Sequence, residues 1–431
     1  MSTNLHKYKL GELIGARRGA SLAGEYYATE GELMRLTLGH FDYQGGGFKD
    51  NTSKDDLYFT GPVKPEFILN EGDIITPLTE QTPGLLGSTA MIPKSGQYIQ
   101  SQDVALITPD ETKLDRNFCY YLLPSKIVKQ QLAAGAQQTK IRHTTPDRIK
   151  DLTVFIPDLP NQKAIGQLLR DMDRKIALNR EINRNLEAMA RQLYDYWFVQ
   201  FDFPDEYGKP YKSSGGKMVW NDKLRREIPE GWIIGSLPDI AVFTNGIACQ
   251  KFRPENNIDK LPVIKIREMR DGITEECEWV KSDIPDSVRV QNGDILFSWS
   301  ASLEVMIWCN GEGGLNQHIF KVTSKNDYPQ SYIFFQILDY IGVFKSIAEA
   351  RKTTMGHITQ DHLNQSAIVL PDSSCVLTQF AKRVAPIFQQ YVANNVEISL
   401  LKKKRDELLP LLMNGQVSVL PSEVNCDLSL D

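Results

Sequence analysis

The chain has 431 residues, of which 41% are hydrophobic and 24% charged, which is typical of a globular protein with two to four domains. The net charge of -5 excludes a generally basic nucleic-acid binder, so any contact with nucleic acid depends on local basic patches. Neither an apolar leader, an apolar run of about 18 residues nor a CxxC pair occurs, so we expect a cytoplasmic protein with reduced thiols, no membrane segment and no bound metal.

Residues 1–158 contain the sequence signals of a mixed α/β domain. A Gly-Asp turn at residues 72–73 precedes an apolar, β-rich run at residues 74–75. Thr-Pro-Asp at residues 145–147 has the composition of a helix start, with the proline in the first turn. Apolar residues then alternate over residues 152–156, which predicts a half-buried strand that ends at the next proline.

Residues 159–200 are predicted to form one long helix. Seam residues recur at alternating spacings of four and three, which is the pattern of a coiled coil over about five heptads. The seam residues are Ile165, Leu169, Met172, Ile176, Asn179, Asn183, Leu186, Ala190, Leu193 and Trp197. A helix of about 38 residues is roughly 57 Å long at 1.5 Å per residue.

Two features of this helix depart from a simple apolar seam. Asn179 and Asn183 either lie buried, where an asparagine lowers stability but fixes the register of a coiled coil, or face the solvent. Four apolar residues beside the seam also widen the apolar face, which either docks a partner subunit or packs against its own domain. These residues are Leu168, Ile182, Met189 and Tyr196.

The second half of the chain repeats the first. Residues 139–158 match residues 353–372 at a constant offset of 214, and residues 70–79 match residues 291–300. LGEL from Leu10 also matches LPDI from Leu237, and all three matches occur in the same order, so we infer an internal duplication. The predicted division is a first domain at 1–158, a helix at 159–200, a connector with some hairpin character at 201–231, a second domain at 232–371, a second helix at 372–415 and a tail at 416–431.

The second helix repeats the heptad spacing of the first at an offset of 215. Its seam residues are Phe380, Val384, Ile387, Tyr391, Asn394, Ile398, Leu401, Arg405, Leu408 and Leu412. Asn394 occupies the heptad position of Asn179, so Asn179, Asn183 and Asn394 are the candidates for setting the register. The wide apolar face is not repeated, because Arg383, Gln390, Glu397 and Lys404 stand there instead.

Basic and amide side chains cluster at two places that suit contacts with nucleic acid, since Arg and Lys bind phosphates and Arg, Asn and Gln read base edges. In the first copy the candidates are Lys140, Arg142, Arg148 and Lys150, and in the second they are Gln250, Lys251, Arg253, Lys265, Arg267, Arg270 and Lys352. The alternative is that these are solvated surface charges, as most lysines and arginines are.

Sequence signatures of catalysis are absent. The chain has no GxxxxGK[ST] phosphate loop, no NPPY or DPPF tetrapeptide and no nucleophile elbow. PDETK at residues 109–113 lacks the spacing of a PD…ExK nuclease. We therefore expect a non-catalytic chain that binds no cofactor; a single-chain methyltransferase or nuclease is the competing interpretation.

Several segments resemble the specificity subunits of Type I restriction–modification enzymes. Residues 159–204 resemble the central conserved region of that family, and IPEGW at residues 228–232 resembles the opening of a recognition domain. NGDILFSWS, GGLNQHIFKV at residues 313–322 and RDELLPLLMNGQV at residues 405–417 are also similar to family segments. The resemblance covers essentially the whole chain.

The resemblance implies two mixed α/β (α+β) target recognition domains, each followed by a long helix, with the two helices paired as an antiparallel coiled coil. It also implies that each domain reads half of a split, asymmetric site in double-stranded DNA. Two adenine methyltransferase subunits would assemble on the chain and two restriction subunits could join them, with S-adenosylmethionine and ATP bound by those partners. A two-headed DNA-binding regulator or scaffold that acts without a methyltransferase is the alternative.

The first copy departs from the family pattern at two points. It lacks an EGW opening, and YIQSQDVALI at residues 98–107 has no convincing counterpart of the QH in GGLNQHIFKV. We therefore expect the first domain to diverge in its core.

Overall fold

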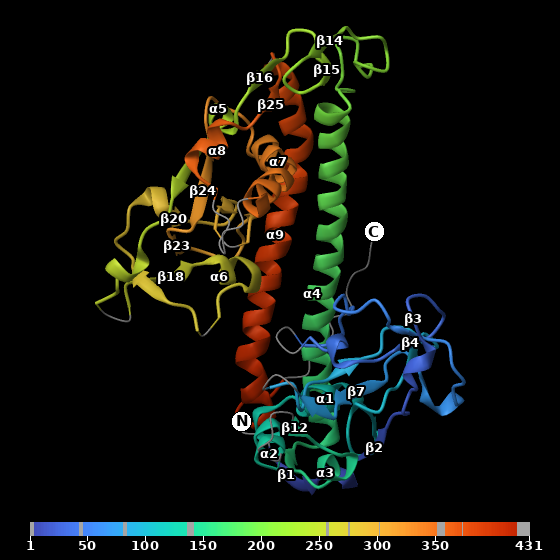
Figure 1. The fold of residues 1–431 in the computed structure, drawn as a ribbon. Helices are drawn as coiled ribbons and strands as arrows, with labels where there is room; N and C mark the ends of the chain where they lie inside the picture. Colours follow the sequence, from blue (N-terminus) through green and yellow to red (C-terminus); the bar gives the residue numbers. More distant parts are fainter. Residues whose placement is uncertain are drawn as a thin grey trace, which may run out of the picture. The chain divides into compact units, whose positions relative to one another are not determined.

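The computed structural model describes residues 4–42, 46–80, 84–135, 142–255, 258–274, 276–300, 302–350, 358–372 and 374–419. The chain forms two compact units, one of residues 1–174 with 403–431 and one of residues 175–402. Helix α4 (Leu159–Tyr194) and helix α9 (Ser374–Met413) each contribute residues to both units (Figure 1). The predicted helices are thereby confirmed, and α4 continues into a π-helical turn at Asp195–Val199.

The first unit contains two sheets and two strand pairs. One sheet has the order β2-β11-β7-β9, and the other has the order β3-β5-β4-β10-β6. The two strand pairs are β1 with β13 and β12 with β8. The strands are β1 (His6–Lys9), β2 (Ile14–Arg18), β3 (Tyr27–Ala28), β4 (Met34–Arg35), β5 (Tyr58–Phe59), β6 (Ile68–Leu69), β7 (Ile74–Pro77), β8 (Thr79–Glu80), β9 (Ala90–Met91), β10 (Tyr98–Ile99), β11 (Val104–Pro109), β12 (Arg142–His143) and β13 (Thr153–Ile156).

Three short helices and the ends of the long helices complete the first unit. They are α1 (Arg116–Leu122), α2 (Lys126–Gly135) and α3 (Pro146–Lys150). The main core joins Phe118 of α1 to Ile165 and Leu169 of α4 and to Leu412 of α9, all buried. The seam residues of the long helices therefore enter the core of this unit.

The second unit contains two four-stranded sheets, a strand pair and a hairpin. The sheets have the orders β17-β24-β21-β22 and β19-β18-β23-β20, and β16 pairs with β25. The strands are β14 (Met218–Asn221), β15 (Arg226–Pro229), β16 (Ile233–Gly235), β17 (Ala241–Asn245), β18 (Lys260–Ile264), β19 (Trp279–Lys281), β20 (Arg289–Val290), β21 (Ile295–Ser298), β22 (Glu304–Ile307), β23 (Gly313–Leu315), β24 (Ile319–Ser324) and β25 (Ile368–Leu370). The hairpin β14–β15 lies in the predicted connector.

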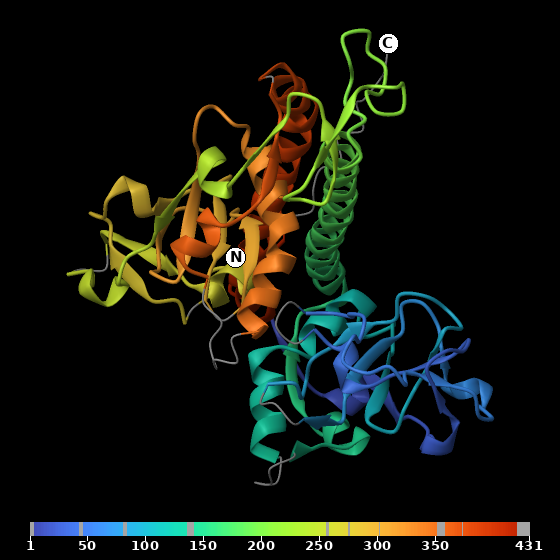
Figure 2. The same cartoon turned by 45° about the horizontal axis from the view of Figure 1, so that its top comes forward.

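Aromatic residues dominate the core of the second unit. Its helices are α5 (Leu237–Ile240), α6 (Ile266–Asp271), α7 (Gln330–Ala350) and α8 (Gln360–Asn364). Helices α7 and α9 lie side by side in both views (Figures 1 and 2), where the Phe335 and Phe388 ring centroids are 5.9 Å apart. Trp197, beyond the end of α4, packs against Phe380 of α9, so the long helices share this core as well.

The two units repeat one topology, which confirms the predicted duplication and the mixed α/β fold. Strands β2-β11-β7-β9 correspond to β17-β24-β21-β22, and the pair β1–β13 corresponds to β16–β25. In the other sheet, β10 is parallel to β4 and antiparallel to β6, just as β23 is parallel to β18 and antiparallel to β20. Both central sheets are antiparallel throughout.

The local sequence signals are also confirmed. Gly72 has φ of 83° and Gly293 has φ of 97°, a conformation that glycine adopts without steric penalty, and each leads into the predicted strand. The Thr145 hydroxyl caps α3 by accepting from the backbone N–H of Arg148 at 3.2 Å. Strand β13 alternates as predicted, with Val154 buried and Phe155 exposed.

Candidate nucleic-acid interface

The candidate residues of the first unit lie on β12 and α3. Arg142 pairs with the buried carboxylate of Glu80, with 3.4 Å between Nη1 and Oε1. Lys150 pairs with Asp147 one helical turn away at 2.7 Å, and Arg148 is exposed. Ion pairs this exposed contribute about 0–1 kcal/mol, so a DNA phosphate could replace the carboxylate partner of Lys150.

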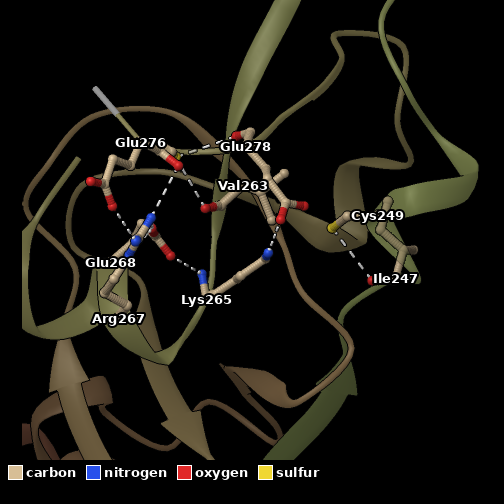
Figure 3. Close-up of polar contacts among 9 residues, drawn as sticks. Ile247, Cys249, Val263, Lys265, Arg267, Glu268, Glu276 and Glu278 are labelled. Carbon is tan, nitrogen blue, oxygen red and sulfur yellow. Dashed lines mark hydrogen bonds and ion pairs between the residues drawn. The ribbon is translucent and has the colours of Figure 1, made fainter. Parts of the chain in front are cut away.

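Lys265 and Arg267, at the start of α6 in the second unit, lie among carboxylates (Figure 3). The Nζ of Lys265 pairs with Oε1 of Glu278, and this hydrogen bond and the lysine charge lower the pKa of Glu278, which keeps the carboxylate ionised. Arg267 lies 3.0 Å from a carboxylate oxygen of Glu268 and 2.9 Å from one of Glu276. These two cations are thus neutralised within the unit.

Arg270, on the last turn of α6, is bound in the same way. Its Nε donates to Glu304 at 3.0 Å, and its Nη2 donates to the Ser302 hydroxyl at 2.6 Å. With Lys265 and Arg267, three cations face four carboxylates, those of residues 268, 276, 278 and 304. A surface with more carboxylates than cations does not attract DNA by its net charge, although the contact of these residues with DNA stays a prediction.

The remaining candidates fall into two groups. Gln250 and Lys251 are exposed in a 3₁₀ turn over Cys249–Lys251, and Arg253 is exposed two residues after it. Lys140 and Lys352 lie outside the described residues. At the offset of 214, Lys140 corresponds to residue 354, two residues from Lys352.

The structure corrects one expectation about the first unit, because residues 101–103 do have counterparts in the second. Ser101 forms a parallel bridge with Ala20, as Asn316 does with Ile247. The carbonyl of residue 103 accepts a backbone N–H bond, and so does that of residue 318. Gln102 therefore corresponds to Gln317, and only the histidine of the QH pair is replaced, by Asp103. The sequence comparison missed this correspondence because none of the four residues that flank the pair is identical in the two units, so that only the strand pairing gives the alignment.

The register asparagines lie in the helix seam, where α4 and α9 pair within the second unit. Asn394 is 5% exposed and donates from Nδ2 to Oδ1 of Asn183 at 2.9 Å. Asn179 is 2% exposed and donates from Nδ2 to Glu397 at 2.7 Å. From Asn179 to Asn183 the residue number rises along α4, whereas the residue that each contacts in α9 falls from 397 to 394, so the two helices are antiparallel. The alternative that these asparagines face solvent is wrong.

The seam contacts are related by an approximate twofold symmetry. The helices correspond at an offset of 215, so the Asn183–Asn394 contact has its symmetry mate at Asn179 and Ile398. Because the isoleucine side chain cannot form a hydrogen bond, the Asn179 amide donates instead to Glu397, the residue before Ile398. One polar contact thus exists in two unequal versions, which marks a unique alignment of the two helices.

We expect the single substitution Asn394→Leu to destabilise the helix pair by about 1–3 kcal/mol, because Asn183 then loses its donor inside the seam. The unfolding temperature of the full chain should fall. The double variant Asn183→Leu/Asn394→Leu, which removes both amides, should regain most of that loss. An Asn394→Leu variant as stable as the parent would show that the buried bond contributes nothing.

The residues of the wide apolar face of the first long helix behave in two ways: one packs against its own unit, and the others stay exposed. Leu168 packs against the core of its own unit. In contrast, Ile182, Met189 and Tyr196 are exposed, with Met189 at 57%. A row of large apolar side chains left in water at helical spacing is typical of a surface for a partner.

The described residues contain neither a cluster of metal-binding side chains nor a helix able to cross a membrane. Among these residues, no group of three or more His, Cys, Asp or Glu side chains is placed to hold a metal ion. Within the same part of the chain, none of the helices combines the length and the hydropathy needed to cross a membrane.

Comparisons with known proteins agree on one family. The sequence profile of the Type I restriction modification DNA specificity domain matches residues 6–188 and 229–408, one match for each repeat. The MjaIX specificity subunit of Methanocaldococcus jannaschii is 24% identical over 70% of this chain and 69% of its own length. The HindI specificity subunit of Haemophilus influenzae is 22% identical over 83% of this chain and 89% of its own length.

A solved structure shows the same fold. The S subunit of a Type I restriction-modification system from M. genitalium superposes with a TM-score of 0.61, over 95% of this chain and 96% of that chain, at 15% identity. Since the family profile covers both repeats and more than half of the sequence, this chain belongs to the family of Type I restriction–modification specificity subunits.

Proposed function

We propose that this chain is the non-catalytic DNA-reading subunit of its complex and that each unit reads one half of a bipartite, asymmetric site in double-stranded DNA. The repeated topology carries the proposal, because the two units share one backbone framework but differ in surface side chains. A framework used twice with different side chains suits a site whose two halves differ in sequence.

The proposal extends to the partners of the chain. Two methyltransferase subunits assemble on it and methylate adenine, and two restriction subunits can join them. The exposed side chains of Ile182 and Met189 on α4 and of Tyr196 in the π-helical turn that follows supply an apolar face for such a partner. S-adenosylmethionine and ATP are bound by the partner subunits, which carry out the chemistry.

The test is methylation-sensitive sequencing of cells that carry this chain with the methyltransferase encoded beside it. We expect adenine methylation at one split motif, and none when this chain is omitted. Exchange of residues 232–371 for those of another family member should change one half of the motif and leave the other half intact.

Two results would contradict the proposal. Methylation that does not depend on this chain would remove its role in recognition, and a change in both half-sites after the exchange would show that the units do not read independently. Specific DNA binding by the isolated chain, with no methyltransferase bound under any condition, would favour a regulator or scaffold.

A further inference from the structure

Corresponding segments of the two units converge on the same backbone arrangement beside the end of the central sheet. In the second unit, the N–H of Gly246 donates to Ile319 at 3.1 Å, and the N–H of Ile247 donates to Leu315 at 2.9 Å. In the first unit, Gly19 donates to Val104 at 3.2 Å and Ala20 donates to Gln100 at 3.0 Å. We call this region of each unit the corner; it comprises residues 18–20, 78 and 100–103 in the first unit and residues 245–247, 299 and 315–318 in the second.

Both corners depend on a glycine at the same place. A Cβ atom on Gly19 would lie 2.2 Å from the carbonyl oxygen of Ser101, and one on Gly246 would lie 2.3 Å from that of Asn316. Neither distance is compatible with a side chain, so the close approach of these two backbone segments requires glycine. The corner is therefore a rigid framework that is built in the same way in both units.

A third segment joins each corner through a backbone bond. Residue 299 donates to the carbonyl of residue 318 at 3.3 Å and accepts from residue 358 at 3.0 Å. Residue 78 likewise donates to residue 103 at 2.8 Å and accepts from residue 144 at 2.8 Å. Residues 144 and 358 correspond at the offset of 214 that relates the two halves of the sequence, so the same three segments meet in both corners.

The side chains on these shared frameworks differ at most positions. The register of the central strands aligns Arg18 with Asn245. The backbone bonds align Leu78 with Trp299 and Asp103 with His318, and Gln102 with Gln317 is the one identical pair of the four. A constant framework with variable side chains is what two domains need if they read different base pairs.

The second-unit corner exposes groups suited to base edges. Its indole Nε1 of Trp299 donates to Oδ1 of Asn245 at 3.0 Å, which orients the amide so that its Nδ2 group serves as donor. Asn245, Gln317 and His318 are exposed, and the Trp299 and His318 rings lie 5.6 Å apart. This corner thus combines amide and imidazole groups with an apolar ring, whereas the cations on α6 are matched by carboxylates.

We propose that the two corners read the bases, with Asn245, Trp299 and His318 setting the specificity of the second unit and Arg18 and Asp103 that of the first, where the counterpart of Trp299 is the buried Leu78. The proposal rests on the proposed function, since it assumes that the chain binds duplex DNA. Amide, guanidinium and carboxylate groups recognise base edges in the major groove, and apolar side chains contact the thymine methyl group. Gln102 and Gln317 are identical in the two units, so they do not account for a difference between the two half-sites.

The test compares Asn245→Ala and His318→Ala, as separate variants of the full chain, in cells that carry the methyltransferase. We expect each variant to relax one or two positions in one half of the methylated motif, with discrimination there reduced about 5- to 150-fold. The other half and the spacer should stay unchanged. Gln291→Ala is the matched control, because Gln291 is exposed beyond the opposite end of β21 and should leave the motif as it is.

The outcomes separate this proposal from the proposed function. If the parent chain directs no methylation, the proposed function fails. If the parent directs methylation but both corner variants keep the parental motif, or lose methylation uniformly at an unchanged unfolding temperature, the corner does not read bases. Relaxation by Arg267→Ala or Arg270→Ala, with no effect of the corner variants, would place the reading surface on α6. Asn245→Ser, which keeps a polar group, replaces Asn245→Ala if that variant does not fold.

Discussion

Deletion of residues 177–183 together with residues 394–400 is expected to shorten the spacer between the two half-sites without changing either half-site. The two segments face each other in the antiparallel seam, since Asn183 bonds Asn394. Each deletion removes one heptad, so Leu186 takes the seam position of Asn179 and Leu401 takes that of Asn394. The remaining seam stays in register.

The size of the change follows from helix geometry. Seven residues correspond to about 10 Å of helix at 1.5 Å per residue. This is about three base-pair steps of 3.4 Å, which is an upper limit because each step also rotates the second half-site by about 35° around the DNA. We therefore expect a spacer that is shorter by one to three base pairs. Sequencing of methylated DNA from cells with the methyltransferase measures both the spacer and the half-sites.

Two controls complete this experiment. The variant Asn183→Leu/Asn394→Leu changes the polar contact but not the length, so it should keep the parental spacer. Deletion of residues 177–183 alone puts the two helices out of register and should abolish methylation. An unchanged spacer in the double deletion, with methylation retained, would contradict the idea that the helix pair sets the distance between half-sites.

The substitution Arg405→Met is expected to destabilise the first unit by about 2–3 kcal/mol. Arg405 on α9 pairs with Asp173 on α4 at 2.7 Å, with their side chains only 14% and 19% exposed. The Tyr121 hydroxyl donates to the other carboxylate oxygen of Asp173 at 2.5 Å. Removing one member of a buried ion pair costs about 3–5 kcal/mol, and the partial exposure of this pair lowers that figure.

The protonation states support this arrangement. Burial, followed by the charge of Asp173, raises the pKa of Tyr121, so the phenol stays protonated and donates. Burial by itself would lower the pKa of Arg405, but the charge and hydrogen bond of Asp173 and then of Asp406 raise it above its usual value. The Arg405 guanidinium therefore stays charged, and the ion pair is not lost by its deprotonation.

The second unit suggests the compensating variant. Asp173, Arg405 and Tyr121 correspond to Phe388, Ala190 and Phe335, which pack as an apolar group there. We expect Tyr121→Phe/Asp173→Phe/Arg405→Ala to regain most of the stability lost in Arg405→Met. Hydrogen exchange measures the effect locally: amides of α1 should exchange about 30- to 150-fold faster in Arg405→Met, while those of α7 should not change. Equal exchange in the parent and Arg405→Met would show that the pair contributes nothing.

Local signals predicted much of the fold. The four-three spacing placed both long helices, the Gly-Asp turns placed β7 and β21, and Thr145 placed the start of α3. These signals work because helix periodicity, turn conformation and capping depend on residues a few positions apart. The repeat of such signals at a constant offset was enough to indicate two domains of one topology.

The candidate site was less predictable, because the environment of a charge depends on residues distant in sequence. The sequence gives no sign that Arg270 has an acidic partner, yet Glu304, 34 residues later in the chain, accepts a hydrogen bond from it. Asn179 and Asn394 share a heptad position, yet they do not bond each other, since antiparallel pairing places Asn183 opposite Asn394. The correspondence of Gln102 with Gln317 likewise came from strand bridges.

The duplication, the fold class and the two coiled-coil helices were thus predictable from the amino-acid sequence, because helices, turns and strands have local patterns and those patterns recur at a constant offset. The folded chain was needed to show which cations are neutralised, which asparagines form hydrogen bonds and which side chains lie in the corner of each unit. Those features depend on which strands pair and how two helices align, and both are fixed by contacts between segments that lie tens to hundreds of residues apart.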